Sequence, residues 1–360
     1  MGRNKKGILA GISLVLGIIL LTTPWAGYVA HLARHQVGSL ILRQKISDVS
    51  PQSPAEKEQF AVIQKAKEFG MKLYGLSDSK SYEYYVDLKR KSLGWNLTVA
   101  PALEMRAREF YFPFAGKFGY LGFFDEALKD RWKVRFTKDN FDVYENEIGA
   151  YSTLGYFKDP IFSTYLEFDG TQLASLILHE MVHERLYLKN DSDFSESMAS
   201  FMERVALNLY LYRQIEAPPQ AIARHKKFIA RYNAFQDLLD GTRENLEKLY
   251  AADLKDSEKL ARKNIELKNL RKRLTQPPFQ DFPYATRVAE MPDLNNAFLV
   301  QNSRYTPSHR NGFSVLLKDC KEDIACWFAG LEKLESCGRD VRRNFAATEI
   351  RLEAALQQCQ

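Results

Sequence analysis

Five consecutive residues, His179-Glu180-Met181-Val182-His183, combine the residue types that a catalytic metal site requires. On an α-helix the two histidines lie one turn apart on the same face, so both imidazoles can reach a single ion. Neutral imidazole and carboxylate ligands with one open position for water are typical of catalytic zinc sites. Glu180 is rotated toward that water, where a carboxylate can accept a proton as the water attacks a carbonyl. The motif predicts hydrolysis with Glu180 as general base.

The same motif also fits a surface helix with two ordinary histidines, and a third ligand would decide between the two interpretations. Glu196 and Glu203 are the acidic candidates downstream. The strongest turn signal lies between them and the motif, at residues 190–193. An antiparallel return from this turn brings Glu196 level with His183. Glu203 lies two turns further on, where a carboxylate can orient a histidine or line the pocket.

Glu196 has a competing role at the start of the returning helix. With Asp193 as N-cap, Glu196 stands at the third helical position of a capping box. A carboxylate that caps the helix cannot also bind the metal. We expect the ligand role and keep the cap as the alternative.

The segment from His179 to Glu203 resembles the bacterial putative aminopeptidase family, whose members are zinc peptidases with a glutamate as third ligand. Further segments carry the same resemblance: Ala150–Tyr156 with Asp159-Pro160, Phe112–Gly116, the helical pair of residues 225–274, and Asn295-Asn296-Ala297 with Tyr305. The resemblance implies His179, His183 and Glu196 as zinc ligands and Glu180 as base. It also makes Tyr151 and Tyr156 pocket residues, either of which could donate a hydrogen bond to an oxyanion or serve only in the core.

The chain departs from the pattern of this family at two places. Members commonly carry a lipid-modified cysteine after the apolar N-terminal segment, where this chain has Trp25 and Ala26. They also tend to have a cysteine pair around the Phe112–Gly116 segment, where this chain has Tyr111 and Lys117. Neither departure concerns a residue of the predicted chemistry.

An uncharged apolar run occupies residues 7–23, and with the apolar residues up to Val29 it reaches the length of a membrane-spanning helix. Trp25 and Tyr28 fall where an interfacial aromatic belt is expected. The positive residues before the run predict that it is anchored in a bacterial inner membrane with the body in the periplasm. A cleaved signal peptide is the alternative, although Pro24 makes a poor cleavage site.

All four cysteines lie in the last 41 residues, at Cys320, Cys326, Cys337 and Cys359. In an exported body such a cluster predicts two disulfides, with three pairings open. His31 and His35 share one helical face but have no carboxylate nearby, so we expect a solvated juxtamembrane helix there.

Periodicity and capping signals predict most of the elements. Ser53 and Pro54 open a helix with Glu56 in a capping box. The further expectations are strands and turns over 82–123, a helix at 124–132, a strand at 132–136, a strand or loop at 142–151, helices over 171–215 with a break at 190–193, a hairpin over 219–274 turning near Gly241 or at 251–256, and a helical C-terminal region.

These expectations describe a helix-rich α+β protein with a zincin-like metallopeptidase domain. Its parts are an anchor at 1–30, a zinc peptidase core at 31–215, a helical hairpin at 216–276 and a C-terminal helical region at 277–360. A net charge of +6 without a basic stripe argues against nucleic-acid binding. The expected function is a zinc aminopeptidase, with Glu203, Glu145 or Glu147 binding the substrate amine. An envelope endopeptidase and a non-catalytic zinc-stabilised scaffold built on the hairpin are the alternatives.

Overall fold

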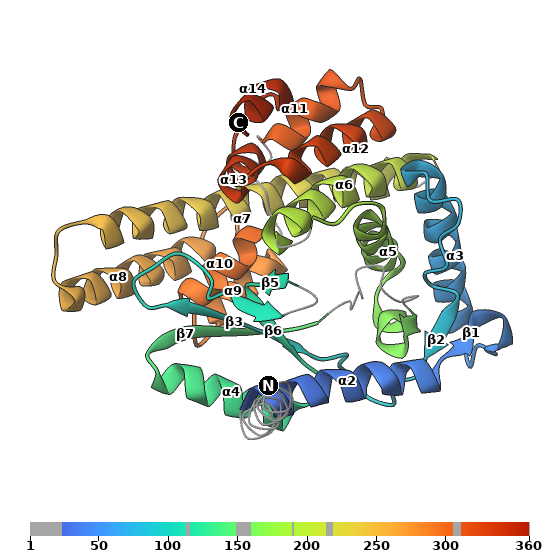
Figure 1. The fold of residues 1–360 in the computed structure, drawn as a ribbon, viewed down its shortest axis with the longest axis horizontal. Helices are drawn as coiled ribbons and strands as arrows, with labels where there is room; N and C mark the ends of the chain where they lie inside the picture. The colour runs from blue at the N-terminus through green and yellow to red at the C-terminus, as the bar shows by residue number, and fades with distance from the viewer. Residues whose placement is uncertain are drawn as a thin grey trace, which may run out of the picture.

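The computed structural model describes residues 24–112, 116–148, 160–188, 191–213, 219–304 and 311–359. Within these residues helices dominate and three small sheets lie among them, so the predicted helix-rich α+β class is confirmed (Figure 1). Helices α3, α5 and α6 form one side of the molecule. The C-terminal helices lie over α6, the hairpin of α7 and α8 projects to the opposite side, and α2 and α4 run along the lower edge.

The largest sheets have three strands each, and their orders are β6-β3-β7 and β1-β2-β8. In the first sheet, β3 (Trp95–Pro101) pairs antiparallel with β6 (Tyr120–Phe123) and β7 (Phe141–Glu147). The shorter strands are β1 (Gln44–Lys45), β2 (Tyr84–Val86), β8 (Ile161–Phe162) and the pair β4 (Phe110–Phe112) and β5 (Gly116–Phe118). Short 3-10 turns follow β1 and β8, at Ile46–Asp48 and Ser163–Glu167.

Helix α4 (Glu126–Lys138) packs on the β6-β3-β7 sheet. Asp125 caps it by accepting a hydrogen bond from the Leu128 amide. The strand predicted at 132–136 is wrong, because these residues belong to α4. In a strand Val134 would share the face of Trp132 and Phe136, but it is 52% exposed while both aromatic residues are buried, which fits the helical period.

Helix α2 (Pro24–Leu42) packs against the same sheet through an aromatic cluster. Tyr28 is 2% exposed, lies edge-on to Phe123 and Trp132, and accepts a hydrogen bond from the Gly122 amide. His31 accepts a hydrogen bond from the Phe124 amide at 2.8 Å. Tyr28 is therefore not available for a membrane-interface belt, and α2 is a docked helix, not the solvated one that we predicted.

The predicted membrane segment at residues 7–23 lies outside the described residues. Among the helices that the structure describes, none combines the length and the apolar character needed to cross a bilayer.

The main hydrophobic core lies among α3 (Pro54–Tyr74), α5 (Gly170–Arg185) and α6 (Ser192–Arg213), and buried side chains of the C-terminal helices complete it. The start of α3 follows the prediction, since Ser53 Oγ accepts a hydrogen bond from the Glu56 amide. The Glu56 carboxylate accepts from the Gln52 amide, one residue before the position that a capping box uses.

The hairpin consists of α7 (Pro219–Ala251) and α8 (Asp256–Leu274). The chain turns between Ala251 and Asp256, so the turn predicted at 251–256 is confirmed. The turn predicted near Gly241 is wrong, because Gly241 lies inside α7. Two shorter helices, α9 (Pro283–Glu290) and α10 (Asn296–Arg304), connect the hairpin to the sheet. Lys263 of α8 also forms a buried 2.5 Å ion pair with Asp142 of β7.

The C-terminal helices are α11 (Gly312–Asp319), α12 (Ile324–Glu332), α13 (Arg339–Ala347) and α14 (Leu352–Gln357), with a 3-10 turn at Lys333–Ser336. Two disulfides join them, as predicted, and the structure selects the pairing Cys320–Cys326 and Cys337–Cys359. A buried ion pair of 2.6 Å between Arg342 and Asp191 ties this region to the start of α6.

Candidate metal centre

The motif lies on α5, whose position is fixed by a strong cap and an apolar face. Asp169 accepts hydrogen bonds from the amides of Thr171 and Gln172, and the Gln172 side chain completes the capping box. Leu173, Ile177 and other apolar residues of the helix are fully buried. The helix ends at Arg185, one turn or less after the second histidine, so the site lies at its C-terminal end.

Helix α6 begins at Ser192 and returns past α5. The Asp191 carboxylate accepts a hydrogen bond from the Phe194 amide, so the first turn of α6 is capped from Asp191. The alternative in which Asp193 caps the helix is therefore wrong. Glu196 is free of a capping role, and its side chain points toward α5.

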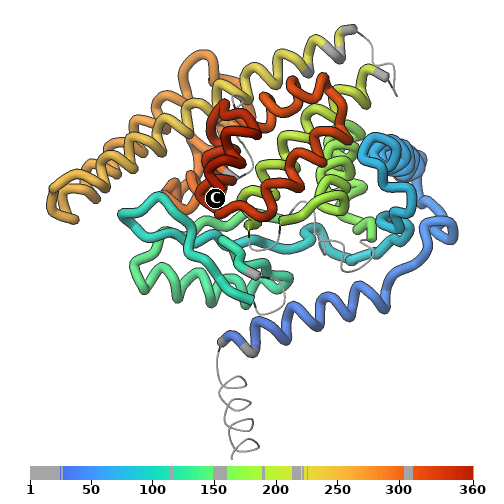
Figure 2. Tube along the Cα trace, turned by 45° about the horizontal axis from the view of Figure 1, so that its top comes forward, coloured from blue at the N-terminus to red at the C-terminus, as the bar shows by residue number. Residues whose placement is uncertain are grey.

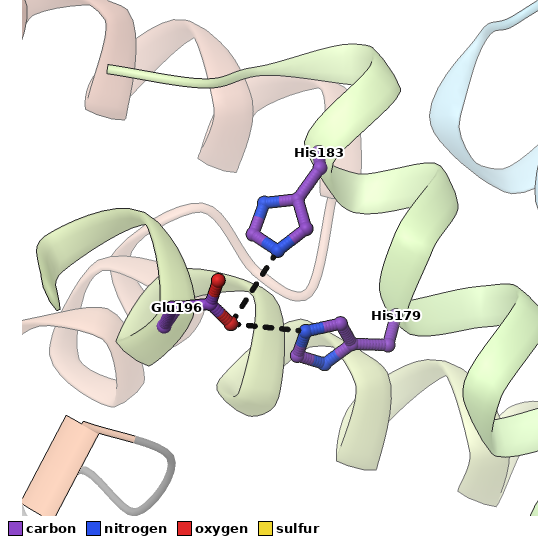
Figure 3. A group of neighbouring side chains, drawn as sticks. All are labelled: His179, His183 and Glu196. Carbon is purple, nitrogen blue, oxygen red and sulfur yellow. Dashed lines mark ion pairs between the residues drawn. The ribbon is translucent and has the colours of Figure 1, made fainter. Parts of the chain in front are cut away.

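The structure brings His179, His183 and Glu196 together (Figure 3). Oε2 of Glu196 lies 3.4 Å from Nε2 of His179 and 3.6 Å from Nε2 of His183. One ligand atom from each residue falls within 4.8 Å of the other two. Zinc bonds of about 2.1 Å in tetrahedral geometry place neighbouring ligand atoms about 3.4 Å apart. The donor set and its spacing therefore fit a divalent ion such as zinc.

The cluster is buried and electrostatically coupled. The side chains of His179 and Glu196 are each 12% exposed and that of His183 is 3% exposed. Burial disfavours the charged form of His179, but hydrogen bonds to Glu196 and Glu203 outweigh it and raise the pKa of His179 well above its ordinary value. Burial opposes the charge on Glu196 too, yet the two histidines hold its pKa far below the usual range.

Glu203 lies about two helical turns after Glu196 on α6. It contacts Nδ1 of His179, whereas Glu196 lies near Nε2 of the same ring. Its Oε2 is 3.0 Å from Nδ1 of His179, and its Oε1 accepts a hydrogen bond from Ser175 Oγ. A carboxylate on the remote nitrogen fixes the orientation of a metal-binding imidazole and increases its basicity. Of the two roles considered for Glu203, this contact favours orienting a histidine.

The other residues singled out from the sequence have different surroundings. Glu180 is partly exposed beside the cluster, and its charge contributes to the raised pKa of His179. Glu145 pairs with Lys129 and Lys133 at 3.3 and 3.2 Å, so these two lysines already neutralise its charge. Glu147 is exposed at the end of β7. Tyr151 and Tyr156 lie outside the described residues.

Two tyrosines that the sequence did not single out lie near the site. The Tyr187 ring stands edge-on to His183, with 5.8 Å between the ring centres. Burial, the negative charge of Glu203 and that of Asp169 raise the pKa of Tyr284 on α9, while Arg287 opposes the shift. Tyr284 is 81 residues from Glu203 in the chain, and no local pattern links the two. Tyr187 lies four residues after His183 in the sequence. An aromatic residue so close to the motif was the one signal that could have placed it at the site.

The fold and this cluster define a helix-rich α+β protein with a buried site of two histidines and one carboxylate. The chain belongs to the family described as Putative aminopeptidase, whose family model matches residues 27–346. This match covers the cluster, the hairpin and most of the C-terminal region. No curated protein and no solved structure matches the chain.

Proposed function

We propose that this protein is a zinc-dependent aminopeptidase with a zincin-like catalytic domain. The observation that carries the proposal is the convergence of His179, His183 and Glu196 at spacings that suit a tetrahedral ion. Its membership of the Putative aminopeptidase family supports the choice of a peptide substrate.

Each residue of the site has a separate role in this proposal. The Nε2 atoms of His179 and His183 and Oε2 of Glu196 would hold the zinc. When bound, zinc supplies a Lewis acid that polarises the scissile carbonyl and acidifies a water molecule. Glu180 accepts the proton of the attacking water on its carboxylate and passes it to the leaving amine. Glu203 holds the imidazole of His179 in orientation through Nδ1.

The location of the enzyme is part of the proposal. The apolar run at 7–23 with positive charges before it supports an inner-membrane anchor and a periplasmic body. The two disulfides support the same compartment, since structural disulfides persist in oxidising surroundings. Peptides of the cell envelope are then the accessible substrates.

The test of the chemistry compares two glutamates of the same helix. In the full chain purified in detergent, Glu180→Gln should retain zinc and lose about 10²–10⁴-fold in cleavage rate, the usual contribution of a general base. Glu184→Gln is the matched control, because Glu184 lies one turn on and bonds Ser79 outside the cluster. It should keep both zinc and activity. Equal activity in the two variants would remove Glu180 from the mechanism.

The test of the site and of the substrate class uses the same preparation. Glu196→Ala should lose zinc, and zinc equal to that of the native protein would exclude Glu196 as a ligand. A free-amine peptide should be cleaved and its N-acetylated form should not. Cleavage of both forms would identify an endopeptidase. Zinc in the native protein with no cleavage of any peptide would favour the non-catalytic scaffold.

A further inference from the structure

Helix α2 presents an apolar face on its outer side. Val29, Val37 and Ile41 are 53%, 53% and 75% exposed. At 100° per residue these three side chains fall within one third of the helix circumference. Tyr28 and Ser39 are buried on the opposite side, against the body of the protein. These three residues therefore form one stripe, which we call the outer face of α2; Leu42, 59% exposed at the end of the helix, lies outside it.

This stripe is unusual for a helix at the surface of a protein in water. A surface helix normally carries charged and polar residues opposite its buried face. Within its arc the outer face also carries Ala30, Ala33 and the partly buried Leu40. Arg34 and Gln36 flank the arc on its two sides, and Arg34 is the single Lys, Arg, Asp or Glu of the whole helix. Single exposed apolar residues need no explanation, but a helix-long row of them marks a contact surface.

Basic side chains are exposed on α4, a helix that contacts α2. Helix α4 contacts α2 through Trp25 and Trp132, whose ring centres are 4.9 Å apart. Arg131, Arg135 and Lys138 are exposed on α4 at positions i, i+4 and i+7, on the side away from its buried residues. Figure 2 shows α2 along the outer edge of the molecule, with α4 above its first half. The helix that carries the apolar row is thus in contact, at its first turn, with the helix that carries the basic row.

We infer that the outer face of α2 lies in the headgroup region of an anionic bilayer, with the basic row of α4 facing the lipid phosphates. Apolar side chains at this depth gain burial, and each basic residue near an anionic surface adds attraction. The chain leads to this location, because the uncharged apolar residues 7–23 end immediately before α2 begins at Pro24.

A second copy of the chain is a weaker candidate for the occupant. A stable protein interface buries about 800 Å² on each partner. The outer face is one helix wide and carries three large apolar side chains, so it falls short of this size. The charges of α4 would also repel their counterparts in a copy placed on the same surface. An anionic lipid surface needs no minimum interface area, and its charges attract the basic residues of α4 instead of repelling them.

The inference concerns how the body is held and does not depend on the peptidase activity. Helix α2 is packed into the aromatic cluster of the sheet through Tyr28, so a bilayer contact along α2 would fix the orientation of the whole body. A simple tether through the apolar segment would leave that orientation free. The two arrangements differ in whether Val37 and Ile41 meet lipid.

The experiment places an environment-sensitive fluorophore at single new cysteines in the full chain. All four native cysteines are in disulfides, so Val37→Cys or Ile41→Cys provides a unique thiol. Ile265→Cys on α8 is the matched control, since Ile265 is 60% exposed on the hairpin. The proteins are reconstituted in phosphatidylcholine vesicles with and without phosphatidylglycerol, and quenching by a shallow nitroxide lipid is measured.

Probes at 37 and 41 should be quenched several-fold more strongly than the probe at 265. Replacing Arg131, Arg135 and Lys138 together with Gln should reduce this quenching in vesicles with phosphatidylglycerol and leave it unchanged in pure phosphatidylcholine. Quenching at 37 and 41 equal to that at 265 would overturn the inference. A second result would also overturn it: the labelled Val37→Cys variant is not quenched by lipid, and its unlabelled form rapidly forms a disulfide between two copies in vesicles. That result would assign the outer face to a second copy of the chain.

Discussion

Glu203 and His179 form a hydrogen-bonded pair on two facing helices, with 3.0 Å between Oε2 of the carboxylate and Nδ1 of the ring. Ser175 holds the other carboxylate oxygen, so the carboxylate is fixed at both ends. The ring is thereby oriented with Nε2 toward Glu196, at 3.4 Å. This pair connects the geometry of the proposed zinc ligands to a residue outside the cluster of three.

The first prediction concerns this pair. Glu203→Ala should weaken zinc binding by about 10–100-fold, the usual effect of losing a carboxylate behind a ligating histidine. Glu203→Gln should give a smaller loss, because its amide oxygen can still accept the Nδ1 proton. Competition with a fluorescent chelator measures the affinity. Ser175→Ala is the control and should change the zinc affinity least. Unchanged zinc affinity in Glu203→Ala would mean that the pair does not orient the ring.

The second prediction concerns removal of the metal. A ligand that binds only the folded state stabilises it by about 2.7 kcal/mol when present at 100 times its Kd. Chelated protein should therefore have a lower Tm than zinc-loaded protein, with a shift that grows with the logarithm of zinc concentration.

Calorimetry or circular dichroism of the full chain measures this shift. Glu196→Ala is the critical comparison, since it removes one of the three clustered donors. Its Tm should respond little to zinc. A shift as large as that of the native protein would place the stabilising ion somewhere other than the cluster.

Local patterns in the sequence predicted the parts of the site that depend on helix geometry. Two histidines four apart share a helix face wherever the helix lies, and a polar turn between two helices brings Glu196 back beside them. The convergence of His179, His183 and Glu196 needed only these two facts. The hairpin was predicted for a similar reason, because α7 and α8 are long and joined by a short polar turn.

Tertiary contacts account for what the sequence did not predict. Tyr28 and His31 follow an apolar run and looked like membrane-proximal residues, but their partners Phe123 and Phe124 are over 90 residues away. A strand at 132–136 would place Trp132, Val134 and Phe136 on one face, but Val134 is 52% exposed and the two aromatic residues are buried, as the packing of a helix requires. Tyr284 approaches Glu203 only through the packing of α9.

The third prediction concerns the buried ion pair between Arg342 and Asp191. The two side chains are 8% and 7% exposed and lie 2.6 Å apart, and Arg342 also donates to the carbonyl of Cys337. Removing Arg342 leaves the buried Asp191 carboxylate with only a longer, 3.8 Å ion pair to the partly exposed Arg339, so the cost should lie at the lower end of the about 3–5 kcal/mol of an uncompensated buried charge. Arg342→Met should therefore lower the unfolding free energy by about this amount in denaturant titration.

The matched double variant separates the lost charge from lost packing. Asp191→Asn keeps an oxygen that can accept from the Phe194 amide and removes the charge. Arg342→Met with Asp191→Asn should be more stable than Arg342→Met alone. If the double variant is the less stable of the two, the cost arises from packing and not from the buried charge.

The fourth prediction compares Gly94, directly before β3, with Gly241 inside a helix. A Cβ at Gly94 would overlap the carbonyl oxygen of Phe123, where β3 and β6 begin their pairing. The backbone must shift to admit it, so Gly94→Ala should cost about 1–3 kcal/mol, as overpacking usually does. Gly241 lies inside α7, and nothing stands within 4 Å of a Cβ there. Gly241→Ala should raise the unfolding free energy by about 0.5–1 kcal/mol, the difference between glycine and alanine within a helix. Thermal and denaturant unfolding of both variants measure the two changes in the free energy of unfolding. A destabilised Gly241→Ala variant would contradict the prediction and favour a turn near Gly241 over a continuous helix.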